Sequence, residues 1–181
     1  MIHRFSLLLA LGAAGLAFAA GAQAASFPVS DQVRFGAWQS ATLEDGDKRH
    51  FRALESESYS DATLSVNATA GICHLPWLEM RVTLAESQTE SRTTRLVPAR
   101  LRVDQTPMLE TMAEFIVEEG DDGFYSHFYL GDLAALLSRM SQGEKLFIGF
   151  EQEDGAPWTM TFTLDGAGQA ISEMQRRCES A

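Results

Sequence analysis

The sequence is poor in basic residues, in histidine and in cysteine. Only 14 Lys and Arg stand against 25 Asp and Glu, which gives the 181-residue chain a formal net charge of −11. Because phosphate binding needs a basic face, nucleic acid is not an expected partner. The same acidity disfavours adsorption to anionic lipid headgroups. By itself the charge is typical of a soluble protein that resists self-association.

The sequence signatures of catalysis are also missing. The chain contains no Gly-x-Ser-x-Gly turn, no Ser-x-x-Lys, no His-Glu-x-x-His and no phosphate-binding glycine loop. Neither cysteine has a papain-like sequence around it. We therefore expect no catalytic residue, no metal and no cofactor, and a binding role rather than an enzymatic one.

One long apolar run stands at the start of the chain. Met1–Arg4 is short and positively charged, the following residues up to Ala22 are almost wholly apolar, and Ala22-Gln23-Ala24 fits the small-x-small pattern of signal peptidase. The alternative is a membrane anchor, since about 18 to 20 apolar residues can span a bilayer. The run is rich in Ala and Gly, and no basic cluster follows it. We predict a cleaved signal peptide over residues 1–24.

The remainder, residues 25–181, has the size of one ordinary domain and shows no linker, repeat or low-complexity tail. The signal with its A-x-A ending is typical of bacteria. The predicted address is therefore the bacterial periplasm or the secreted fraction, with no stable membrane insertion after the signal is removed.

Two cysteines, Cys73 and Cys178, are present. An even pair in an oxidising compartment is most simply one disulfide, and a closed loop of about 100 residues would stabilise the fold by about 4 to 5 kcal/mol. The alternatives are a catalytic thiol or a metal site that also uses the adjacent His74. The other histidines of the exported part, His50 and His127, stand alone in strand-like segments, which disfavours a metal site.

Alternation with a period of two dominates the exported part. Between Trp77 and Leu84, apolar residues alternate with Glu79, Arg81 and Thr83, as in a half-buried strand. Asp-Gly pairs between such runs predict hairpins. The predicted strands cover residues 35–43, 49–54, 62–69, 77–84, 96–104, 108–117, 124–130, 146–151 and 158–164. We expect Trp38, Trp77 and Trp158 to pack in the core.

Two segments have helical spacing instead. The first has Asp132 as a suitable N-cap and Gly143 as a suitable terminator, and the second, C-terminal helix has Asp165 as its expected cap. The apolar positions of the two helices are Leu133, Leu136, Leu137 and Met140, and Ala167, Ala170, Ile171, Met174 and Cys178. The predicted class is α+β, an antiparallel β-sheet or sandwich with two short helices.

Acidic residues gather in four places, at Glu44–Asp47, Glu118–Asp122 and Glu151–Asp154, and at Glu110 with Glu114. Turn formation explains three of them, because each lies between apolar strands. The spacing of a calcium-binding loop is absent. An acid/base pair remains an alternative, since sequence does not reveal which carboxyls share a cleft. We predict that Glu118, Glu119, Asp121 and Asp122 form an exposed hairpin tip that binds a partner.

The C-terminal half also resembles a known family. The stretches that carry the resemblance are Leu101-Arg102-Val103-Asp104-Gln105-Thr106-Pro107, Leu136 through Phe147, and Phe162-Thr163-Leu164-Asp165-Gly166 with the helix ending at Arg177-Cys178. They are similar to the periplasmic accessory family associated with type VI secretion systems, and more loosely to the invasion-associated locus B exported proteins. Members pair a late cysteine with one in an earlier strand, where Cys73 stands here.

Composition and resemblance together predict a non-enzymatic accessory or binding protein of the bacterial envelope. Its expected partner is another envelope protein, bound through strand edges or acidic hairpin tips. The alternatives are a cell-wall hydrolase with an unrecognised carboxylate pair and an acidic inhibitor of a basic secreted enzyme.

Overall fold

A computed structural model describes residues 27–93, 96–151 and 155–181. The predicted signal peptide lies outside the described residues. The strands are β1 (Val29–Phe35), β2 (Trp38–Asp45), β3 (Lys48–Glu55), β4 (Ala62–Thr69), β5 (Trp77–Thr83), β6 (Arg92–Thr93), β7 (Val97–Val103), β8 (Leu109–Val117), β9 (Gly123–Phe128), β10 (Lys145–Phe150) and β11 (Trp158–Thr163). The helices are α1 (Leu133–Met140) and α2 (Ala167–Glu179).

All nine predicted strand segments contain a strand, but the sheet has two further members. The first predicted segment, residues 35–43, was expected to be one continuous strand. Gly36 instead turns the chain with a φ of 57°, so that β1 ends before it and β2 begins after it. The short β6 lies between two of the predicted strand segments, 77–84 and 96–104, and pairs with β8. The expected hairpin turns at Gly46 and Gly120 have the positive φ that favours glycine.

The predicted α+β class and the sandwich arrangement are wrong. In the described residues, eleven strands form one antiparallel sheet in the order β1-β2-β3-β4-β5-β9-β8-β7-β10-β11, with β6 beside β8. The helices have only 8 and 13 residues, so strands make up most of the fold. Two pairings between strands that are not consecutive, β5 with β9 and β7 with β10, join the hairpins into a single sheet. Alternation reveals strands but not these neighbours.

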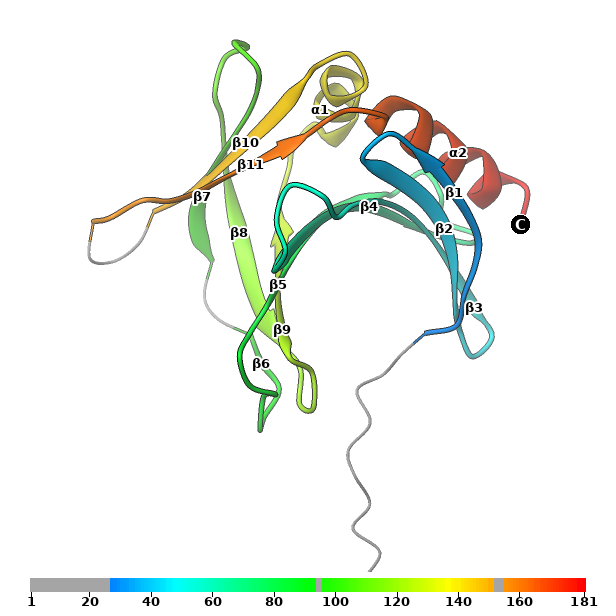
Figure 1. Ribbon diagram of the computed structural model, residues 1–181, viewed down its shortest axis with the longest axis horizontal. Helices are drawn as coiled ribbons and strands as arrows, with labels where there is room; N and C mark the ends of the chain where they lie inside the picture. The colour runs from blue at the N-terminus through cyan, green and yellow to red at the C-terminus, as the bar shows by residue number, and fades with distance from the viewer. Residues whose placement is uncertain (1–26, 94–95, 152–154) are drawn as a thin grey trace, which may run out of the picture.

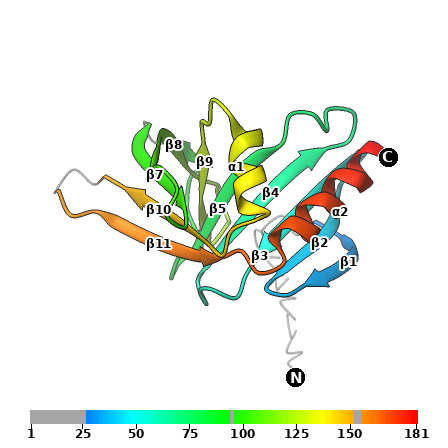
Figure 2. The same cartoon turned by 90° about the horizontal axis from the view of Figure 1, so that it is seen from above.

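The sheet is strongly bent (Figure 1). Strands β2 to β5 curve into an arch, and α2 lies along the outer side of this arch. Seen from above, α1 lies between α2 and the half of the sheet that contains β7, β8, β10 and β11 (Figure 2). The core is therefore enclosed by the outer face of the arch, the opposite half of the sheet and both helices.

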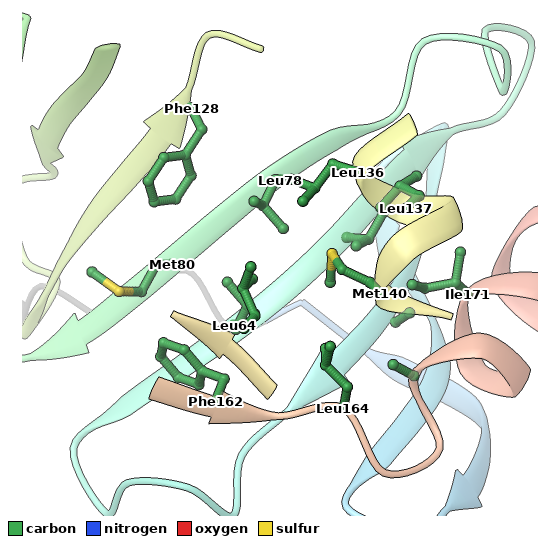
Figure 3. Packing of buried hydrophobic residues seen from close by; sticks show 14 of the residues in the cluster. Leu64, Leu78, Met80, Phe128, Leu136, Leu137, Met140, Phe162, Leu164 and Ile171 are labelled. Atoms are coloured by element: carbon green, nitrogen blue, oxygen red, sulfur yellow. The ribbon is translucent and has the colours of Figure 1, made fainter. Parts of the chain in front are cut away.

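Every strand except β1 and β6 contributes one of its faces to this core. Leu64 and Leu78 of the arch are completely buried, as is Met140 of α1, and they lie close to Phe162 and Leu164 from the other half (Figure 3). α2 contributes its predicted apolar side, since Ala167, Ala170, Ile171, Met174 and Cys178 are all buried. Trp38 is also buried in the core, as predicted, and its indole Nε1 donates to the carbonyl of Thr163 at 2.8 Å.

The two helix starts differ. Asp132 caps α1 as predicted, because its side chain accepts a hydrogen bond from the amide of Ala135. The prediction that Asp165 caps α2 is wrong, since the N-cap is Gly166 with a φ of 88°. A Cβ at Gly166 would collide with the carbonyl oxygen of Phe35. Glycine is therefore required there both by its backbone conformation and by the close approach of the chain after β1.

The disulfide between Cys73 and Cys178 is confirmed, with Cα atoms 5.7 Å apart. It ties the end of α2 to the loop between β4 and β5, on the outer side of the arch. A disulfide of this kind fits an oxidising, extracytoplasmic compartment. In the part of the chain that the structure describes, no helix is long and apolar enough to cross a membrane.

Candidate functional site

The inner side of the arch is polar, because the side chains that point away from α2 alternate with the core residues. On β5, Leu78 and Met80 are buried in the core, so Trp77, Glu79 and Arg81 lie on the opposite face. The register continues this face onto the neighbouring strands in three cross-strand rows. The rows are Arg52, Asn67 and Trp77; Ser65, Glu79 and His127; and Thr63, Arg81 and Tyr125. We call these nine residues the polar arch face.

Glu79 is the centre of the polar arch face. Its carboxylate accepts hydrogen bonds from Nη2 of Arg52 at 3.3 Å, from Nε2 of His127 at 2.9 Å and from the indole Nε1 of Trp77 at 3.4 Å. The ring nitrogen of His127 is the donor, because an ionised carboxylate only accepts. Three different strands therefore converge on one buried carboxylate.

The protonation state of Glu79 follows from these contacts. Burial alone raises the pKa of Glu79, but the hydrogen bond from His127 and the positive charge of Arg52 outweigh it and hold the pKa below its usual range. Glu79 is consequently ionised at neutral pH. It can stabilise a positive charge or accept a proton, and it is unsuited to act as a general acid.

The partners of Glu79 are partly exposed and firmly held. The side chain of Glu79 is 10% exposed, against 30% for Arg52 and 37% for His127. Nε of Arg52 donates to the side-chain oxygen of Asn67 at 2.5 Å, and the Asn67 amide donates to Oγ of Ser65 at 3.0 Å. Asn67 and Glu79 thus hold the partly exposed guanidinium of Arg52, and Glu79 holds the partly exposed imidazole of His127. Both groups can recognise carboxylate or other acceptor groups.

Arg81 connects the polar arch face to the predicted acidic tip. Its guanidinium donates to Asp121 at 2.8 Å and also binds Asp122, and its Nε lies 3.3 Å from the hydroxyl of Tyr125. The Tyr125 hydroxyl in turn donates to Asp121. Burial acts to raise the pKa of Asp121, but the hydrogen bonds from Tyr125 and Arg81 lower it overall.

The four residues predicted to bind a partner lie close together in the turn between β8 and β9, but they are not equivalent. Glu118, Glu119 and Asp122 are exposed, whereas Asp121 is half-buried. Oγ of Ser91 donates to Glu118 at 2.9 Å and accepts from the amide of Glu119 at 2.9 Å. The turn is therefore anchored by internal contacts, and Arg81 offsets part of its negative charge.

The other acidic groups are scattered. Glu44 and Asp45 are the exposed last residues of β2, and Asp47 lies in the exposed turn before β3. Glu110 and Glu151 both lie near Arg100. Glu114 accepts from the hydroxyl of Tyr129 at 2.8 Å. Residues 152–154 of the third cluster lie outside the described residues. Within the described ranges, no three His, Cys, Asp or Glu side chains are grouped so as to hold a metal ion.

The two edge strands of the sheet, β1 and β11, were also predicted as contact sites, and both have features that hinder the pairing of a further strand. The edge of β11 is covered by side chains from the loop after β3, because Ser58 Oγ and Tyr59 Oη accept from the amides of Thr163 and Thr161 at 2.9 and 2.8 Å. β1 has an irregular register between Ser30 and Val33. Such covers and bulges hinder the addition of a further strand.

A recess of about 720 Å³ lies between α1, α2 and the loop that carries Cys73. Leu137 and Ile171 line it on the two helices, and Leu75, which is 60% exposed, lines it on the loop. Its polar residues include His74, so the structure places this histidine beside the disulfide at a surface recess rather than in a metal site.

The sequence did not reveal the Glu79 cluster. In the sequence His50 and His127 stand alone, because the separation between Glu79 and His127 along the chain hides their pairing across β5 and β9. The available signal was the polar side of β5. A strand with Trp77, Glu79 and Arg81 on one face was bound to place these groups beside those of its neighbours. The prediction that Trp77 packs in the core is wrong, since it is half-buried on the polar arch face.

Comparisons with known proteins establish the fold alone. No model of a protein family matches the sequence, and no protein of curated function matches it. A solved structure, that of invasion associated protein B from Bartonella henselae, is similar with a TM-score of 0.55 and 14% identity, over 83% of this chain and 99% of that chain. The resemblance to the invasion-associated locus B proteins is thereby supported as a likeness of fold. No family model and no curated protein supports the resemblance to the type VI secretion family.

Proposed function

We propose that this protein is an exported, non-enzymatic accessory protein of the bacterial envelope that binds another envelope protein through the polar arch face. The likeness of fold to an invasion-associated protein and the disulfide both favour a place outside the cytoplasm. The predicted signal peptide favours the periplasm in particular. A fold can carry many functions, so the proposal depends on the site and not on the likeness.

The observation that carries the proposal is the preorganisation of Arg52 and His127 by buried Glu79. Arginine and aromatic residues dominate the binding energy of many interfaces. Side chains that are already fixed lose little entropy when a partner binds. The partly exposed guanidinium and imidazole beside the indole of Trp77 have both properties. The matching partner surface carries carboxylate or carbonyl groups and an apolar or aromatic side chain.

The acidic turn extends this surface and would steer the encounter. Four carboxylates against the single charge of Arg81 leave the turn negative. A partner with a basic patch opposite the turn would associate faster at low salt, because rim charges act mainly on the association rate. At physiological salt the effect reaches only about 8 Å. Glu118 and Glu119 would contribute most, since Asp121 and Asp122 are bound by Arg81.

The alternative of a hydrolase with a carboxylate pair has an argument against it. Such a pair needs one carboxyl with a raised pKa and one that stays ionised, facing the same cleft. Burial raises the pKa of Glu55 despite its hydrogen bonds from Ser58, and the pKa of Glu79 is lowered. Glu55 lies on the core face of the sheet and Glu79 on the opposite face, so these two carboxyls do not face one substrate.

Site-specific photo-crosslinking in living cells tests the proposed function. A photoreactive phenylalanine analogue replaces Tyr129, which is exposed at the end of β9 beside the polar arch face, and a matched control replaces exposed Arg176 on α2. We expect a covalent adduct with one envelope protein from position 129 and none from position 176. An adduct from α2 alone would move the interface away from the arch and refute the proposal.

The captured partner then allows a test of the acidic turn. The double variant Glu118→Gln, Glu119→Gln should slow association at low salt and leave dissociation and folding stability nearly unchanged. The pair Asp121→Asn, Asp122→Asn should in addition destabilise the fold, because it removes both partners of Arg81. If the association rate changes neither with salt nor in the Glu118→Gln, Glu119→Gln variant, the negative charge of the turn contributes to solubility and not to binding.

A further inference from the structure

The core face of the sheet is not covered along its whole length. Over the arch, both helices and the opposite half of the sheet bury it, and Leu64, Leu78 and Phe162 have no exposed surface. Beyond the helices, the same face carries Phe124 of β9 and Trp158 of β11, which are only half-buried. Large aromatic side chains are thus left partly open to solvent at this end of the core.

These rings form one continuous cluster. Phe115 lies 5.4 Å from Phe124 and 5.2 Å from Phe150 between ring centroids, and Trp158 lies 4.9 Å from Phe150 and 5.8 Å from Phe124. Phe150 is buried, so the cluster extends from the core to the surface. An apolar molecule that touched the outer rings would be in contact with a surface that continues into the core.

A pocket of about 250 Å³ opens on this cluster. Its floor consists of Leu84, Phe115, Val117 and Phe124, and its polar lining residues are Gln88 and Arg92. A cavity of about 150 Å³ already holds a benzene-sized molecule. The pocket therefore has room for a short acyl chain or a single substituted ring, and it is slightly smaller than the usual range of ligand sites.

Arg92 gives the pocket a chemical preference. It lies on β6, opposite Val117 of β8, and its side chain is exposed. Among the ion pairs of the described residues none involves Arg92, although Asp and Glu far outnumber Lys and Arg in this protein. An exposed guanidinium at the edge of an apolar pocket is complementary to a molecule with an apolar body and an anionic head.

We propose that this pocket binds a small amphiphilic carboxylate, with its apolar body on Phe115 and Phe124 and its carboxylate on Arg92. The site faces away from the polar arch face, because its rings lie on the core side of the sheet. It is therefore a second binding site, on the opposite face of the sheet from the polar arch face, although Gln88 is hydrogen-bonded through its backbone to Gly120 and Asp121 of the acidic turn. Gln88 can donate an additional hydrogen bond to the head group.

Titration of the purified exported protein with octanoate, and with 1-octanol as the uncharged analogue, tests the proposal. Binding is followed by tryptophan fluorescence, because Trp158 contacts the rings that line the pocket. Trp158→Phe should abolish the response and thereby separate it from Trp38 and Trp77. We expect saturable binding of both molecules at different affinities, octanoate being the tighter.

Two variants and a control decide the outcome. Arg92→Ala should weaken octanoate roughly five-fold and leave 1-octanol unchanged, as for a solvent-exposed charge pair, whereas Arg139→Ala on α1 should change neither. Val117→Trp should fill the pocket and block both molecules; because it adds a tryptophan, its binding is followed by isothermal titration calorimetry and its folding by circular dichroism. The proposal is overturned if the titration with octanoate does not saturate. It is also overturned if the affinity for octanoate is the same in the wild type and in the Arg92 and Val117 variants.

Discussion

Replacing Glu79 by glutamine tests the centre of the polar arch face most directly. Glutamine keeps the shape and one acceptor oxygen, but its amide would meet a donor from Arg52 or His127. Breaking a fully buried ion pair costs about 3 to 5 kcal/mol. Since Arg52 is 30% and His127 37% exposed, water takes over part of the lost contacts. We therefore expect a loss of about 2 kcal/mol in the free energy of unfolding at pH 7.

The pH dependence distinguishes this cause from a general packing defect. The pKa of Glu79 is lower in the folded protein than the value of about 4.3 in an unfolded chain. Its stabilising contribution is thus complete above about pH 4.3 and is lost as the pH falls through the folded pKa. The stability difference between the wild type and Glu79→Gln should shrink below about pH 4.

Urea unfolding followed by circular dichroism, at steps from pH 7 down to pH 3.5, measures this difference. Glu110→Gln is the matched control, because the Glu110 side chain is 82% exposed and lies 4.0 Å from Arg100. It should change the stability by less than about 0.5 kcal/mol. A Glu79→Gln defect of the same size at every pH would refute the assignment of the effect to the carboxylate charge.

Three further predictions concern the fold and its export. Replacing Cys73 and Cys178 together by serine should lower the free energy of unfolding by about 4 to 5 kcal/mol, since the bond joins residues 105 positions apart; an equal denaturant midpoint with and without the bond would contradict this. Gly166→Ala should lower the free energy of unfolding by more than about 1 kcal/mol, because φ is positive there and the new Cβ would collide with the carbonyl oxygen of Phe35. Gly131→Ala meets open space, so its melting temperature should fall far less than that of Gly166→Ala. Intact-mass measurement of the exported protein should find a chain that begins after Ala24, and recovery of the full-length chain from the membrane fraction would refute the signal peptide.

Local patterns were enough to locate the elements. Ala62–Thr69 has the predicted boundaries, and Leu133–Met140 begins directly after the predicted cap, because alternation and helical spacing are properties of a few consecutive residues. The cap at Asp132 is local for the same reason. The disulfide followed from counting, since two cysteines allow only one intramolecular bond in an oxidising compartment.

The sequence misled where a distant segment decides the local structure. Asp165 has the right chemistry for a helix cap, but the carbonyl of Phe35 leaves space only for Gly166. Asp121 and Asp122 have the composition of a free turn, but Arg81 binds them from β5. In both cases the contacting residue lies far away along the chain, where no local pattern can indicate it.

The sequence by itself therefore determined nine of the eleven strands of the described residues, both helices, the covalent link and the alternation of sides along those strands. Tertiary structure alone decided which polar sides meet. The pairing of β5 with β9 brings His127 to Glu79 and makes one sheet where separate sheets were possible. The physical reason is that alternation fixes the direction of a side chain relative to its own strand, whereas the choice of neighbouring strand depends on packing over the whole core.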